Sequence, residues 1–73
     1  MLTEYEKYIK FGKNVAKYRK AKKLTQNQFA DKLDISREHL AKIETAKRGV
    51  SIGLLYKMSE ILEISEKDFF DFD

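Results

Sequence analysis

The chain has 73 residues, which suits one small domain, and it contains neither cysteine nor proline. Without cysteine it cannot form a disulfide or a thiolate metal site, and no apolar run reaches the roughly 18 residues of a membrane span. The first ten residues, MLTEYEKYIK, carry acids and lack the apolar segment of a signal peptide, so we expect a cytoplasmic protein. Absent proline and rare glycine predict an all-α fold with short turns.

Charge is distributed unevenly along the chain, whose formal net charge is +3. Residues 10–48 hold twelve Lys or Arg and four acids, whereas residues 49–73 hold two basic residues and six acids. A small domain polarised in this way suits a polyanion on one side. The alternative is a solubility pattern, and charge alone does not decide between them.

Residues 3–22 are predicted to form one long helix or two abutting helices. Thr3 and Glu6 have the spacing of a capping box, and apolar residues recur every three or four positions. Gly12 lowers helix stability by about 1 kcal/mol relative to alanine, so a two-helix arrangement would break near it.

The first nine residues exceed what a minimal domain needs. We assign 1–9 as an N-terminal helical extension and 10–73 as the domain proper. Tyr5 and Tyr8 favour packing of the extension over fraying, and pairing with a second subunit is the other alternative.

A dense basic run, KYRKAKK, occupies residues 17–23. It can reach phosphates beside a nucleic-acid groove, although most of it is expected to be a solvated face. Arg19 is placed to meet Glu44, and such a pair would join two helices. Losing one partner would be costly because the other charge would be stranded.

Residues 25–44, TQNQFADKLDISREHLAKIE, contain two short amphipathic segments. Thr25 begins the first, where Gln28 completes a capping box, and Ser36 caps the second. About four residues separate them, which favours the steep crossing of a helix-turn-helix unit. Asp34 occupies the turn, where glycine would be easier.

The second segment presents a polar face at 100° per residue. Leu40 and Ile43 fall on the inner side, and the outer side carries Arg37, Glu38, Ala41, Lys42 and Thr45. Arginine can donate twice to guanine, glutamate can accept from cytosine, and lysine can reach guanine or phosphate. We therefore predict base reading by this face; the alternative is an ordinary solvated surface.

Phosphate contacts are predicted on both sides of this helix. Gln26 lies in a first helical turn, where backbone N–H groups and the helix dipole attract an anion. Lys47 and Arg48 lie in the loop TAKRGV, residues 45–50, in which Gly49 supplies backbone freedom.

The C-terminal third is predicted to form two further helices. Ser51 caps one that runs to about Ile64, and its apolar stripe is expected in the core. Ser65 opens a short last helix bearing Phe69, Phe70 and Phe72. One short helix cannot bury all three rings, so we expect at least one, Phe72 first, to be exposed or covered by another subunit. These phenylalanines are the predicted dimer interface.

The residues VAKYRKAKKLTQNQFADKLDISREHLAKIETAKRG and SIGLLYKMSEILEISEKDFF resemble the Cro and phage-repressor type helix-turn-helix domain of prokaryotic regulators. The resemblance implies a compact five-helix domain that places the helix from Ser36 in the major groove. It also implies base reading by Arg37, Glu38 and Lys42, and an internal ion pair between Arg19 and Glu44. The implied contacts to the DNA backbone come from Thr25, Gln26, Thr45 and Lys47.

The leading hypothesis is a sequence-specific regulator of double-stranded DNA, acting as a homodimer on a two-fold operator without cofactor or metal. The alternative is a protein-interaction or antitoxin-like module with the same fold. An enzyme is disfavoured because the chain has one histidine, His39, and no nucleophile placed beside a base.

Overall fold

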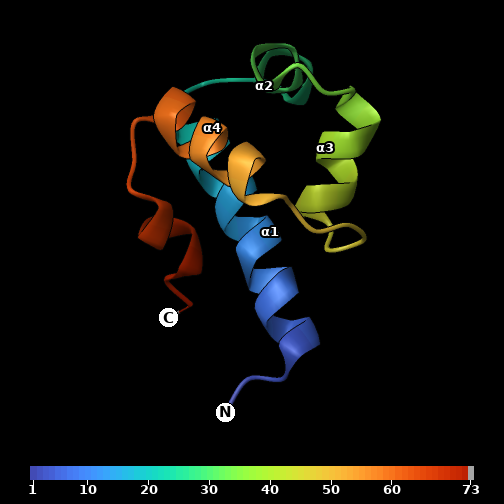
Figure 1. Cartoon of the computed structure of the whole chain (residues 1–73), viewed down its shortest axis with the longest axis vertical. Coiled ribbons are helices and arrows are strands. Elements are labelled where there is room, and N and C mark those ends of the chain that lie inside the picture. The colour runs from blue at the N-terminus through green and yellow to red at the C-terminus, as the bar shows by residue number, and fades with distance from the viewer. Residues whose placement is uncertain (73) are drawn as a thin grey trace.

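The computed structural model describes residues 1–72, which form helices and connecting turns without a strand. The helices are α1 (Glu4–Ala21), α2 (Gln26–Leu33), α3 (Arg37–Glu44) and α4 (Ile52–Leu62), followed by a 3-10 helix, η1 (Glu66–Phe70). Figure 1 shows α1 running through the molecule, with α3 and η1 on opposite sides of it. None of the described helices is long and apolar enough to cross a membrane.

The fifth element differs from the predicted five-helix arrangement because it is a 3-10 helix rather than an α-helix. It has only five residues, too few to gain from α-helical propagation. The side-chain amide of Asn14 donates to the carbonyl oxygens of Phe69 and Asp71, each at 2.9 Å. Both carbonyls are thereby bound to α1, and the chain leaves η1 in an extended conformation at Asp71.

Helix α1 continues through Gly12 without a break. A Cβ at Gly12 would lie 2.7 Å from the carbonyl oxygens of both Ile43 and Glu44. The glycine therefore lets the backbone of α1 approach the end of α3 closely. Because α1 is a single helix from Glu4 to Ala21, the alternative of two abutting helices is not observed.

A left-handed residue that is not glycine follows each of the four α-helices within two residues of its end. The backbone φ is 60° at Lys23, 58° at Asp34, 64° at Ala46 and 57° at Glu63. After each of them, the next N–H donates to a carbonyl five residues back, as Lys47 does to Lys42 at 2.8 Å. In the loop after α3, the left-handed residue is thus Ala46. Gly49, which the sequence predicts to supply backbone freedom in this loop, does not have a positive φ.

The hydrophobic core draws on all five elements. Its buried members are Phe11, Val15, Phe29, Ala30, Leu33, Leu40, Ile43, Met58, Leu62 and Phe69. The Phe69 ring is fully buried, with its centroid 5.7 Å from that of Phe11 and 6.1 Å from that of Tyr18.

The burial of Phe69 corrects its predicted place in a dimer interface, because its ring faces α1 rather than solvent. Among the three C-terminal phenylalanines, Phe70 is the exposed one, at 50%. Phe72, which we expected to be the most exposed, is half-buried against the core.

Candidate nucleic-acid interface

Side-chain caps fix the start of both helices of the α2–α3 unit. The Thr25 hydroxyl accepts from the Gln28 N–H at 3.0 Å, and the Gln28 side chain accepts from the Thr25 N–H at 2.9 Å. The Ser36 hydroxyl accepts from the His39 N–H at 2.9 Å. Between the helices, left-handed Asp34 makes the turn. Local contacts therefore fix where α2 and α3 begin and where the chain turns between them.

Helix α3 is anchored by one face and leaves the other in solvent. Leu40 and Ile43 are buried, whereas Arg37, Glu38 and Lys42 are exposed. This arrangement presents a guanidinium, a carboxylate and an ammonium on a short, rigid helix, with Ala41 half-buried among them.

A buried ion pair joins the ends of α1 and α3. Arg19 donates through Nε to Glu44 Oε2 at 2.7 Å and through Nη2 to Oε1 at 3.1 Å. Its remaining Nη1 donates to the Leu24 carbonyl at 2.8 Å, in the turn before α2. The two side chains are only 8% and 6% exposed. Because both carboxylate oxygens are bonded in fork geometry, the pair is a strong orienting contact.

The same carboxylate holds Gln26 in the first turn of α2. Gln26 Nε2 donates to Glu44 Oε1 at 2.9 Å, and Gln26 is half-buried. Glu44 thus links three helices, whereas the sequence predicts only its pair with Arg19, which joins two. One N–H and the carbonyl oxygen of the Gln26 amide are left for another partner.

The residues after α3 differ in how free their side chains are. The Thr45 hydroxyl donates to the Ala41 carbonyl at 2.8 Å, so its hydrogen is already used. Lys47 and Arg48 are exposed in the loop that leads to α4. Burial, together with the positive charges of Arg48 and Lys42, lowers the pKa of His39 below 6.5.

The predicted site residues therefore lie on neighbouring parts of one structural unit, the helices α2 and α3 and the loop that follows them. The helix starts at Thr25 and Ser36, the α3 outer face, and the loop after α3 all belong to the unit that Glu44 ties together. Two structural residues escaped prediction. The sequence identifies Gly12 only as a weak position in a helix, and nothing in the sequence singles out Asn14, because both residues act through contacts with residues distant in sequence.

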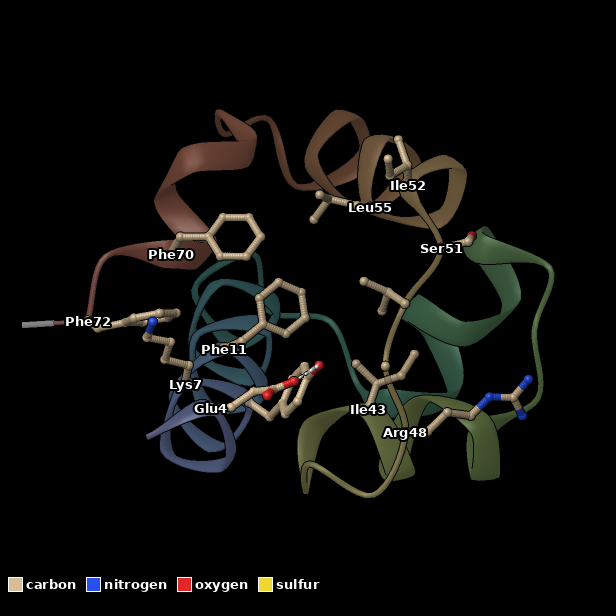
Figure 2. A pocket seen from close by; sticks show the side chains of 13 residues that line it. Glu4, Lys7, Phe11, Ile43, Arg48, Ser51, Ile52, Leu55, Phe70 and Phe72 are labelled. Atoms are coloured by element: carbon tan, nitrogen blue, oxygen red, sulfur yellow. Dashed lines mark hydrogen bonds between the residues drawn. The ribbon is translucent and has the colours of Figure 1, made fainter. Parts of the chain in front are cut away.

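An apolar groove of about 480 Å³ lies away from the α3 outer face, between α1, the loop after α3, α4 and the C-terminal segment. Figure 2 shows Phe11, Phe70 and Leu55 along it. The ring centroids of Phe11 and Phe70 are 5.2 Å apart. Charged residues of both signs also line it: Glu4, Lys7 and Arg48, the last of which is also a predicted phosphate contact. No group of three or more potential metal ligands occurs among residues 1–72.

The comparisons with known proteins agree with this geometry. The family model described as Helix-turn-helix matches residues 15–69. The chain is 40% identical over 63 residues to control protein C.MunI from a Mycoplasma species, and the match covers 85% of each chain. It is 42% identical over 55 residues to the uncharacterised regulator YqaE of Bacillus subtilis, covering 75% of this chain and 47% of YqaE.

Two solved structures extend the comparison. The restriction-modification controller protein C.AhdI from Aeromonas hydrophila is 28% identical with a TM-score of 0.81, covering 86% of this chain and 96% of that one. The biofilm master regulator SinR, solved in complex with DNA, is 29% identical with a TM-score of 0.76, covering 84% and 98%. The chain belongs to the helix-turn-helix family of the Cro and phage-repressor type, whose members are DNA-binding transcription regulators and not enzymes.

Proposed function

We propose that this protein is a sequence-specific controller of transcription that binds a two-fold operator as a homodimer. Helix α3 enters the major groove, and Arg37, Glu38 and Lys42 contact base edges. The single observation that carries the proposal is the exposure of these three side chains on a helix whose opposite face is buried.

The proposed backbone contacts surround this helix. Thr25 and Gln26 stand at the start of α2, and Lys47 and Arg48 in the loop after α3. Helix N-termini and cationic side chains are the usual phosphate ligands of such domains. Thr45 is the remaining proposed contact; its hydroxyl oxygen can accept, but donation to phosphate would require it to release the Ala41 carbonyl.

The proposed dimer surface is the apolar groove. Phe70 and Phe72 line it, and Ile52 at its edge is 69% exposed. Residues 1–9 are proposed to be an extension that adds to this surface, since Tyr8 also lines the groove and is 50% exposed. An isologous contact here would leave α3 of each subunit free to enter its own half-site.

The assignment to controllers rests on the relatives. C.MunI and C.AhdI are named as control or controller proteins, and this chain spans most of both. A controller of this class acts on DNA, so we place the protein in the cytoplasm of a prokaryotic cell.

Selection of bound duplexes from a random pool, at about physiological salt, tests the proposal because non-specific binding is then weak. The expected result is an enriched two-fold motif with half-site centres about one helical turn apart. Sedimentation of the complex should show two copies per duplex. Binding without enrichment from a folded protein would contradict the proposal and favour the protein-interaction alternative.

A further inference from the structure

A hydrogen bond between the side chains of Gln26 and Glu44 connects the start of α2 to the end of α3. Gln26 is the first residue of α2, and Glu44 is the last residue of α3. Their side chains are joined by the 2.9 Å bond from Gln26 Nε2 to Glu44 Oε1. The bond crosses the motif from the start of one helix to the end of the next.

We propose that Glu44 is a positioning residue for a phosphate contact made by Gln26. This inference rests on the proposed function, because it assumes a duplex against α2 and α3. Glu44 fixes one N–H of the Gln26 amide, which leaves the second N–H oriented for a phosphate oxygen. A free glutamine side chain would have to lose its rotamer freedom on binding, whereas the fixed one has already lost it in folding.

Arg19 makes this arrangement electrostatically acceptable. A carboxylate near the phosphates would repel them if it were unpaired. Arg19 gives Glu44 two charge-assisted bonds at 2.7 and 3.1 Å, and a third bond fixes the guanidinium on the Leu24 carbonyl. The pair is neutral as a unit, so Glu44 can orient Gln26 without presenting a net negative charge to DNA.

The bond from Gln26 to Glu44 also holds the phosphate-binding amide at a fixed place relative to the last turn of α3, and this placement matters for reading bases. The phosphate held by Gln26 becomes connected to the last turn of α3 through a single carboxylate, independently of the Asp34 turn. Contacts with phosphates set the register of a reading helix in the groove. Glu44 would therefore contribute to DNA binding although it is only 6% exposed and reads no base.

A double-mutant cycle on DNA affinity tests the proposal. Gln26→Ala is measured in the wild-type chain and in an Arg19→Met/Glu44→Leu background, which removes the ion pair without stranding a charge. The probes are the selected operator and an unrelated duplex, each titrated over a range of salt. Asn27→Ala, at the exposed neighbouring position, is the matched control in both backgrounds.

In the wild-type chain, Gln26→Ala should weaken binding of both duplexes about tenfold, since a neutral donor to a charged acceptor is lost. The salt slope should stay unchanged, because glutamine displaces no counterion. In the background without Glu44, the same change should weaken binding less than about threefold. Asn27→Ala should have the same effect in both backgrounds.

An equal loss from Gln26→Ala in both backgrounds would overturn the role of Glu44 while leaving the proposed function intact. No loss in either background would overturn the phosphate contact itself. Failure of the wild-type chain to bind any duplex would instead overturn the proposed function, and the positioning role with it. If the Arg19→Met/Glu44→Leu chain does not fold by circular dichroism, Glu44→Asp serves as the background, because it keeps the charge but withdraws the carboxylate by one methylene.

Discussion

Gly12 of α1 lies directly against the last turn of α3, so close that a Cβ would stand 2.7 Å from the Glu44 carbonyl oxygen. That carbonyl belongs to the residue whose side chain binds Arg19 and Gln26. The position of α3 therefore depends on the missing side chain at Gly12 as well as on the ion pair between Arg19 and Glu44.

Gly12→Ala should destabilise the fold despite the better helix propensity of alanine. The new methyl meets two backbone carbonyls, which cannot rotate away, so we expect a loss of about 1–3 kcal/mol in the free energy of unfolding. Urea denaturation measures it. Gly53→Ala is the matched control: nothing lies within 4 Å of its added Cβ in α4, and it should gain about 0.5–1 kcal/mol. Equal gains from both changes would refute the close contact.

Helix starts were far more predictable than helix ends. The sequence predicts caps at Thr3, Thr25 and Ser36, and each side chain accepts the expected backbone N–H. Capping depends on residues three positions apart, which the sequence displays. The helix ends lack their usual glycine, so the left-handed residues had no local signal except at Asp34.

The tertiary contacts were predictable only in part for a similar reason. An outer and an inner face of α3 follow from helical periodicity, and the family resemblance implies the Arg19–Glu44 pair. The bond from Gln26 to Glu44, and the choice of Phe69 rather than Phe72 for the core, depend on how helices distant in sequence meet. No periodicity contains that information.

Ala46→Gly should stabilise the protein. Ala46 has a φ of 64°, in the left-handed region that costs an L-residue roughly 1–2 kcal/mol. Glycine relieves this strain but gains more entropy on unfolding, so we expect a net increase of about 1 kcal/mol. The reverse control is Gly49→Ala, where φ is not positive and the added Cβ meets nothing within 4 Å. It should not destabilise; thermal unfolding of both variants separates backbone strain from a general effect of the loop.

Stability should decline slightly as pH falls below about 6.5, the ordinary pKa of histidine. Burial, with Arg48 and Lys42 nearby, lowers the pKa of folded His39. The unfolded chain therefore binds a proton at higher pH than the folded chain does, and protonation favours unfolding. This contribution is fully present above the unfolded pKa and is lost toward the lower, folded one.

Unfolding followed from pH 7.5 to 5.5 measures this effect, with His39→Gln as the comparison. The variant should show a flatter profile in this window. Glu6 and Glu63, whose pKa values are lowered by hydrogen bonds to Thr3 and Lys22, affect only the region below pH 4.5. An identical slope in both proteins above pH 5.5 would show that His39 is not responsible.

Phe70→Ser should weaken the proposed dimer with little effect on the fold. Phe70 is half exposed and lines the groove, and the Asn14 amide fixes the backbone on either side of it at Phe69 and Asp71. We expect at least a tenfold rise in the dimer dissociation constant, as for an aromatic anchor of an interface. Sedimentation equilibrium measures it. Tyr56→Ser removes a similarly exposed ring outside the groove and should leave the constant unchanged.

Arg37→Ala should change which sequence is bound, and Lys47→Ala only how tightly. Arg37 is exposed in the first turn of α3, so losing its bonds to a base should reduce discrimination at one position per half-site by roughly 1–3 kcal/mol.

Lys47 is exposed in the loop, where a phosphate contact carries no sequence information. Its loss should weaken all duplexes alike and reduce the salt slope by about 1 per subunit. Titration of single-base operator variants at several salt concentrations distinguishes these outcomes, and a base-specific effect of Lys47→Ala would move that lysine into the reading set.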